Sequence, residues 1–108
     1  MQKDDNLHEV EKLARDTDSS HAVPLNIVGR ARLIVEGLSE SDQPHSVFVG
    51  AQDGIVLEWA TPDCECYLSI EVLGVDIEYN HDLRGKMHRG NLETISDMKS
   101  LIKKFKTC

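Results

Sequence analysis

The residues with the clearest capacity for chemistry are two cysteines and a histidine. Cys64 and Cys66 flank a single glutamate, and the strand pairing expected below places His81 opposite Cys66. Zinc binds such thiolate and imidazole groups, but structural zinc sites use cysteine pairs two to four residues apart together with a second pair of ligands. His88 is the one further candidate ligand. We therefore expect Cys-x-Cys to be the end of a β-hairpin that binds no metal or cofactor, with metal binding and a redox role as the alternatives.

The cysteine count bears on the compartment. The third cysteine is Cys108, and three cysteines of which two are near neighbours do not form a disulfide framework. Cys66 is therefore expected to behave as a small buried hydrophobic residue with a free thiol, and the cytoplasm is the expected compartment. The sequence shows no signal peptide. No membrane association is expected, because no apolar run approaches the ~20 residues that cross a bilayer.

Carboxylates form the second group of chemically active residues, and they are concentrated in the middle of the chain. Residues 45–80 contain no lysine or arginine, in a chain whose net charge is −7, and their acidic residues are Asp53, Glu58, Asp63, Glu65, Glu71, Asp76 and Glu78. Phosphate binding needs a basic surface, so nucleic acid is excluded as the main partner. Residues 81–108 are richer in bases, but their lysines are expected to form the solvated face of an amphipathic helix.

Three helices and a sheet are expected to position these residues. The predicted helices cover residues 5–15, 24–38 and 92–106, the last with Asn91 as its N-cap. The predicted strands cover residues 46–50, 55–60, 66–72 and 75–79, with a fifth within 81–90. The sequence therefore predicts a single α+β domain over residues 1–108, with residues 1–4 flexible. It is an antiparallel meander of four to five strands with helices on one face, in the order α-α-β-β-β-β-(β)-α.

Two short loops set the expected register of the central strands: four residues at 61–64 and two at 73–74. The expected pairs are Ile55 with Ile70, Leu57 with Leu68, Trp59 with Cys66, Leu68 with Tyr79, Ile70 with Ile77, Val72 with Val75, and Glu71 with Asp76. All the apolar members then share one face, and a slip of one residue would destroy that agreement. The predicted core residues of the sheet are Leu57, Trp59, Leu68, Ile70 and Ile77.

The opposite face of the predicted sheet is acidic. We expect it to dock a basic protein partner through Glu58, Tyr67, Glu71, Asp76 and Glu78, because clustered charge of one sign steers association. The alternative is a solvated face whose charges prevent edge-to-edge aggregation. A divalent-cation site is a weaker alternative, since no EF-hand loop is present.

The hairpin sequence resembles a set of small, functionally uncharacterised bacterial proteins with an Asp-Gly-Gly-[Ile/Val]-x-Leu-Glu-Trp signature. The matching residues are Asp53, Gly54, Ile55, Leu57, Glu58 and Trp59, with Leu68, Ile70 and Val72 in the next strand. The resemblance extends over residues 5–106 in the order of elements. One glycine of the signature is missing, and Asp-Thr-Asp-Ser-Ser replaces a Trp-Asp-Gly-like stretch before the second helix. The set has no agreed activity, and its members resemble accessory proteins of mobile elements, including toxin–antitoxin and immunity loci.

Motifs of catalysis and nucleotide binding are missing from the sequence: it contains no G-x-S-x-G, H-E-x-x-H, P-loop or G-x-G-x-x-G. We therefore expect a non-enzymatic protein-binding module whose acidic sheet face docks a basic partner, of the antitoxin, immunity or inhibitor type. A metal- or small-molecule-binding accessory protein is the alternative, and an enzyme is the third choice. The sequence leaves open the partner's identity and whether the chain forms a homodimer.

Overall fold

The computed structural model describes residues 2–15, 23–50, 54–61, 63, 65–74 and 76–106, with the backbone alone at residues 14 and 15. The elements, in chain order, are α1 (Gln2–Arg15), α2 (Leu25–Gly37), the 3₁₀ helix η1 (Glu40–Asp42), β1 (Ser46–Val49), β2 (Ile55–Thr61), β3 (Cys66–Val72), β4 (Ile77–Leu83), β5 (Lys86–Asn91) and α3 (Ile95–Lys106). The predicted fifth strand is therefore confirmed as β5.

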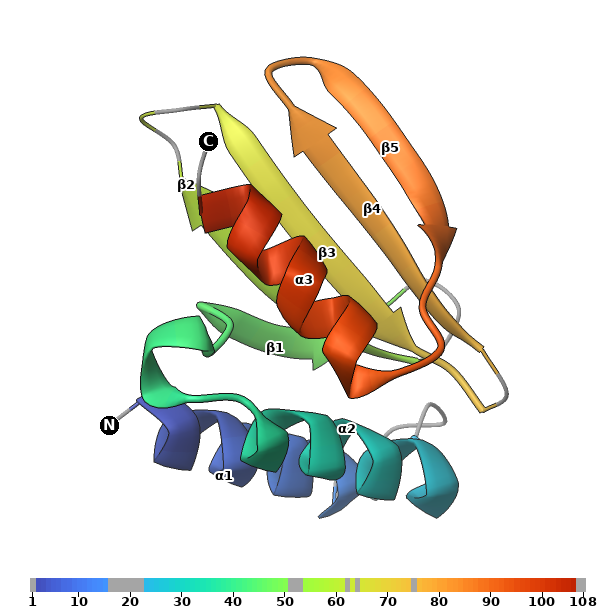
Figure 1. The fold of residues 1–108 in the computed structure, drawn as a ribbon. Helices are drawn as coiled ribbons and strands as arrows, with labels where there is room; N and C mark the ends of the chain where they lie inside the picture. The colour runs from blue at the N-terminus through green and yellow to red at the C-terminus, as the bar shows by residue number, and fades with distance from the viewer. Residues whose placement is uncertain are drawn as a thin grey trace.

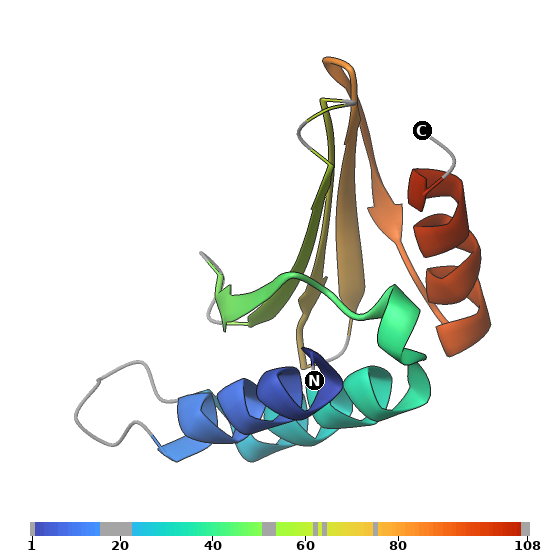
Figure 2. The same ribbon diagram turned by 90° about the vertical axis from the view of Figure 1, so that its left-hand side faces the viewer.

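The five strands form one antiparallel sheet in the order β1-β2-β3-β4-β5. Figure 1 shows α3 lying across β3, and α1 and α2 side by side below β1. The turned view shows the sheet edge-on, with α3 on one side and the α1–α2 pair across the lower end of the strands (Figure 2). This arrangement confirms the predicted α+β meander.

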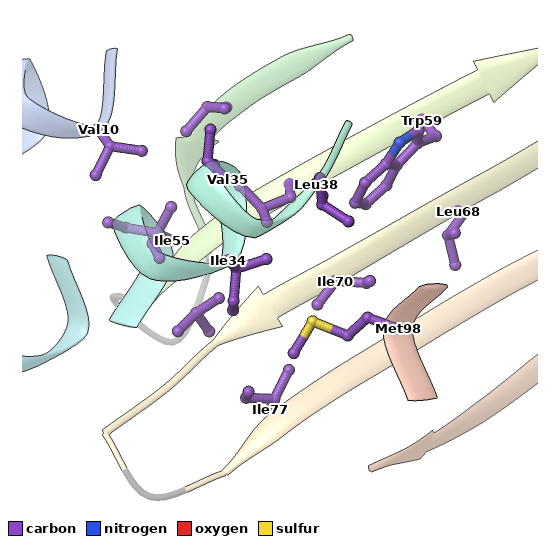
Figure 3. Close-up of a cluster of buried hydrophobic side chains, with 14 of the residues drawn as sticks. Val10, Ile34, Val35, Leu38, Ile55, Trp59, Leu68, Ile70, Ile77 and Met98 are labelled. Carbon is purple, nitrogen blue, oxygen red and sulfur yellow. The ribbon is translucent and has the colours of Figure 1, made fainter. Parts of the chain in front are cut away.

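One hydrophobic cluster joins the helices to one face of the sheet. Val10 of α1, Val35 of α2 and Met98 of α3 belong to the same buried cluster as Trp59 and Ile70 of the sheet (Figure 3). All the predicted core residues are buried: Leu57, Trp59, Leu68, Ile70 and Ile77. The helices therefore cover one face of the sheet, and among the described residues no helix covers the other.

The predicted strand register is wrong by two residues in both central hairpins. The observed pairs are Ile55 with Val72, Leu57 with Ile70, Trp59 with Leu68, Thr61 with Cys66, Leu68 with His81, Ile70 with Tyr79, Val72 with Ile77, and Cys66 with Leu83. Side chains alternate with a period of two, so a shift of two residues leaves each one on its predicted face. That is why the core prediction holds although the pairs do not.

The turn between β3 and β4 explains part of this shift. The backbone N–H of Leu73 donates to the carbonyl of Asp76 at 2.9 Å, which closes a four-residue loop over 73–76. The commonest two-residue hairpin turn, type I′, needs positive φ at both positions, and a leucine at the first would be strained. The two-residue turn lies instead between β4 and β5, where Arg84 and Gly85 have φ of 52° and 88°.

Two helix starts also differ from the prediction. Helix α1 begins at Gln2, three residues before the predicted start. Helix α3 begins at Ile95, and Asn91 ends β5 instead of acting as its N-cap. The cap is a reciprocal box, in which the N–H of Asp97 donates to Thr94 Oγ1 at 3.1 Å and the N–H of Thr94 donates to Asp97 Oδ2 at 3.2 Å.

A buried amide joins α1 to the end of α2, next to a hydrogen bond that joins η1 to the sheet. Gln43 Nε2 donates to the carbonyls of Val35 and Leu38 at 2.8 and 3.0 Å, and Gln43 Oε1 accepts a hydrogen bond from Asn6 Nδ2 at 3.0 Å. Next to it, the indole N–H of Trp59 donates to the carbonyl of Asp42 at 2.9 Å. Gln43 therefore satisfies the carbonyl of Leu38 and adds a second hydrogen bond to the carbonyl of Val35, which also accepts the N–H of Leu38 at 3.3 Å.

Replacing this amide by a hydrocarbon tests its contribution. We expect Gln43→Leu to lower the free energy of unfolding by about 2–4 kcal/mol, because it removes three hydrogen bonds and leaves buried polar groups unsatisfied. Urea denaturation followed by circular dichroism measures the loss.

A double-mutant cycle with Asn6→Leu separates the hydrogen bond from the loss of side-chain shape. The double variant should be less destabilised than the sum of the two single variants, because it leaves no unpaired amide facing the other. Strict additivity would show that Asn6 and Gln43 act independently.

Candidate functional site

The face of the sheet opposite the helices is the candidate site, and we call it the open face. Its residues are Ser46, Phe48, Val56, Glu58, Ala60, Tyr67, Ser69, Glu71, Glu78, Asn80, Asp82, Met87, Arg89 and Asn91. They come from all five strands, because every second residue of a strand points to the same side. The ladder arranges them in three rows that run across the strands.

The structure brings four of the predicted site residues together on the open face. Glu58, Tyr67, Glu71 and Glu78 lie on the neighbouring strands β2, β3 and β4. Asp76 does not join them, because it precedes β4 and lies in the 73–76 loop. The predicted pair of Glu71 with Asp76 is therefore wrong.

The residue opposite Glu71 is Glu78, so the like-charged pair is kept with a different partner. Like charges directly opposite each other in a sheet are unfavourable. The carboxylate of Glu71 lies against the backbone at Gly50, where an added Cβ would collide with it. Glu71 is thus partly enclosed at the β1 side of the face, whereas the side chains of Glu58 and Glu78 are half-exposed.

Sequence reasoning missed several open-face residues. Phe48 and Met87 are large apolar side chains that are 40% and 51% exposed, and they lie on the same face as the predicted Tyr67, which is 46% exposed. Asp82 stands between Tyr67 and Met87 in one row. The alternation that identified Glu58 would have identified Asp82 and Met87 as well, had residues 81–90 been assigned to two paired strands.

Tyr67, Asp82 and Met87 also line a hollow. Its volume is about 140 Å³, and Glu58, Ser69 and Asn80 complete its polar wall. Asp82 Oδ1 accepts a hydrogen bond from the N–H of Gly85 at 2.9 Å, which fixes the orientation of its carboxylate. The hollow therefore combines an aromatic ring, a thioether and two carboxylates in a shallow depression.

Two of the candidate metal ligands, Cys66 and His81, are described by the structure, and they do not face each other as the predicted register had them. Cys64 lies outside the described residues, and His81 pairs with Leu68 instead of facing Cys66. Cys66 is buried as predicted, but it is disulfide-bonded, which corrects the expectation of a free thiol. The other two cysteines of the chain lie outside the described residues. Within the described residues, no three His, Cys, Asp or Glu side chains come together as a metal-binding group.

His81 is instead a buried histidine on the core face. Its side chain is 2% exposed, and its ring centroid lies 6.1 Å from that of Phe105 and 6.3 Å from that of His88. Within the described part of the chain its Nε2 has no hydrogen-bond partner. Burial lowers the pKa of His81, the nearby His88 and Lys104 lower it further, and Asp82 partly opposes them.

This burial makes stability depend on pH. The unfolded chain gains a proton on His81 near pH 6.5, whereas the folded chain does so only at lower pH. The stabilisation is therefore complete above about pH 6.5 and is lost as pH falls through the folded pKa. We expect His81→Phe to flatten the fall in the urea midpoint between about pH 7 and pH 5, whereas His8→Gln, at an exposed site, should leave that fall unchanged. An unaltered slope in His81→Phe would show that another group causes it.

In comparisons with known proteins, no family model, no curated protein and no solved structure matches the chain. The resemblance of the hairpin to the bacterial set therefore stays a prediction. Over the described ranges, every helix is too short or too polar to cross a membrane.

Proposed function

We propose that this chain is a non-enzymatic protein-binding module whose open face docks a basic protein partner, of the antitoxin, immunity or inhibitor type. The observation that carries the proposal is the combination of exposed Tyr67 and Met87 with the carboxylates of Glu58, Glu78 and Asp82 on one helix-free sheet face. Protein interfaces are enriched in aromatic residues and methionine, and carboxylates around such residues favour a cationic partner.

The shape of the open face supports a protein partner over a small molecule. Small-molecule sites are concave, mostly apolar and measure about 300–1,000 Å³, whereas the hollow at Tyr67 measures about 140 Å³. A second depression on this face measures about 470 Å³, but the open-face side chains that line it, Glu78, Asn80, Arg89 and Asn91, are all polar. A side chain of a partner fits such a depression while the rest of the partner covers the surrounding strands.

The chemistry of the hollow favours an arginine or lysine side chain. A guanidinium group stacks on a tyrosine ring and pairs with carboxylates, and the flexible thioether of Met87 packs against an aliphatic stem. Glu58 and Asp82 supply the carboxylates beside the ring. Arg89 is the one base among the open-face residues, so the basic part of the partner is expected to centre on β2, β3 and β4, away from β5.

Charge removal tests the role of the carboxylates. The triple variant Glu58→Gln, Glu71→Gln, Glu78→Gln keeps the side-chain shapes and relieves the repulsion between Glu71 and Glu78. We expect equal or greater stability but weaker partner binding, mainly through a slower association rate that depends less on salt. A pull-down with both proteins as bait identifies the partner, and stopped-flow mixing at several salt concentrations measures the rate.

A matched control removes three charges elsewhere. Asp4→Asn, Asp5→Asn, Glu93→Gln alters the net charge equally at exposed positions outside the open face. If this control slows association as much as the open-face variant does, the effect comes from net charge and the proposed face is wrong.

Truncating the apolar anchors tests the hollow. Tyr67→Ala and Met87→Ala remove exposed side chains, so the fold should be little affected. Each should increase the dissociation rate, with a cost of about 1–2 kcal/mol in partner binding if the side chain is an anchor. Leu33→Ala on α2, whose side chain is 64% exposed, is the matched control and should bind as the parent protein does. If Tyr67→Ala and Met87→Ala bind the partner as tightly as Leu33→Ala does, neither side chain is an anchor and the hollow is not part of the interface.

A further inference from the structure

The outer edge of β5 is a second surface with recognisable chemistry. β5 is the last strand of the sheet, and every residue in it is exposed except Gly90, which has no side chain and is half-buried. Its pairing with β4 runs without a bulge from Glu78 with Asn91 to Leu83 with Lys86, and it contains no proline. Bulges, prolines, short length and charged side chains are the usual means of blocking an edge strand. This six-residue strand has no bulge and no proline, and its charged side chains, Lys86 and Arg89, are both basic, so they oppose a basic strand but not an acidic one.

The register shows which backbone groups face outward. In an antiparallel pair, residues alternate between those that exchange hydrogen bonds with the neighbour and those that do not. Leu92 donates its N–H to the carbonyl of Ile77 at 2.7 Å, so the bonded set includes this pair and every second pair after it, up to Lys86 at the turn. The outward-directed N–H and C=O groups of β5 therefore belong to Met87, Arg89 and Asn91.

The charge of this edge is opposite to that of the chain as a whole. The net charge is −7, yet residues 83–92 contain Arg84, Lys86 and Arg89 and no acidic residue. Lys104 of α3 lies close enough to His81 of β4 to lower its pKa. Like charges directly opposite each other destabilise strand pairing, so a second copy of this basic edge is disfavoured and an acidic strand is favoured.

We propose that the outer edge of β5 pairs with an extended acidic segment of a partner protein. The outward N–H and C=O groups of Met87, Arg89 and Asn91 form the new ladder, as in strand addition to a sheet edge. Carboxylates on alternate residues of the added strand lie beside Arg89 on one face, or beside Lys86 on the other. The side chains of Met87, Arg89 and Asn91 belong to the open face, but the contact proposed here uses their outward backbone groups at the sheet edge, whereas the basic partner contacts β2, β3 and β4.

A titration with designed peptides tests the proposal on the intact protein. The probe is an eight-residue peptide of alternating valine and glutamate, added to ¹⁵N-labelled protein. We expect chemical-shift changes centred on β5 and slower hydrogen exchange at the amides of Met87, Arg89 and Asn91. The same peptide with alternate N-methylated residues cannot form the ladder and should not bind. A valine–lysine peptide should not protect these three amides, because it repels the edge; any contact that it makes with the acidic open face is a different one.

Two substitutions at one position separate charge from hydrogen bonding. Arg89→Gln removes the charge and keeps the outward N–H, and it should weaken binding about fivefold, equivalent to roughly 1 kcal/mol. Arg89→Pro also removes the N–H, at an edge position that bonds nothing in β4, and should abolish binding. Lys103→Gln on α3 removes one exposed charge away from the edge and should bind as the parent protein does.

Three outcomes would overturn the proposal. Equal binding of the N-methylated peptide would show that charge alone attracts the probe. If the valine–lysine peptide protects the β5 amides as well as the valine–glutamate peptide does, the charge of the edge does not select its partner. Protection of the Met87, Arg89 and Asn91 amides from exchange that increases with protein concentration, in the absence of peptide, would show that a second copy occupies the edge. If Arg89→Pro fails to fold, the N-methylated peptide and Arg89→Gln still decide the question.

Discussion

The side-chain amide of Gln43 is the interaction on which the arrangement of the helices depends. It binds carbonyls near the end of α2 and accepts a hydrogen bond from Asn6 of α1, at the point where η1 leads into the sheet. The adjacent Asp42 receives the indole N–H of Trp59 and is paired with Lys106, which lowers the pKa of its carboxyl. The contacts of α1, α2, α3 and β2 therefore converge on two neighbouring residues, Asp42 and Gln43. Because buried amides are unfavourable without partners, each of these elements fixes the position of the others.

Fixing the helices on one side determines what the other side can do. The core face is occupied by α2 and α3, so the chemistry available to a partner is that of the open face and of the β5 edge. These two surfaces differ in sign: carboxylates of β2, β3 and β4 dominate the first, and Lys86 and Arg89 dominate the second. The charge separation follows from the order of the strands, because the acidic strands come first in the sequence and a meander keeps sequence neighbours side by side.

The alternation of apolar and polar residues predicted which side of the sheet a residue faces, but it did not predict which residues lie opposite each other on neighbouring strands. Leu57 and Trp59 were assigned to the core correctly, because their side depends on whether a position is odd or even. The pairs depended on loop lengths, and Leu73 at the β3–β4 turn does not take the left-handed conformation that a two-residue loop of type I′ needs. The same error made Asp76 a site residue. Asp82 and Met87 stayed unassigned for another reason, because residues 81–90 were not divided between two paired strands. The disulfide of Cys66 depends on which cysteines approach each other in space, and the spacing of cysteines along the chain does not contain that information.

The position of Trp59 has a spectroscopic consequence. It is the sole tryptophan, it is 2% exposed, and its indole N–H is bound to the backbone of η1. Its fluorescence therefore reports whether η1 and the end of α2 are seated on the sheet, and the emission should shift to longer wavelength when that junction opens. The ring points away from the open face and β5 has no tryptophan, so events on either surface leave the tryptophan fluorescence unchanged unless they disturb the junction. A label or an introduced fluorophore is needed to see binding, and the native signal is left as an independent monitor of folding in the same sample.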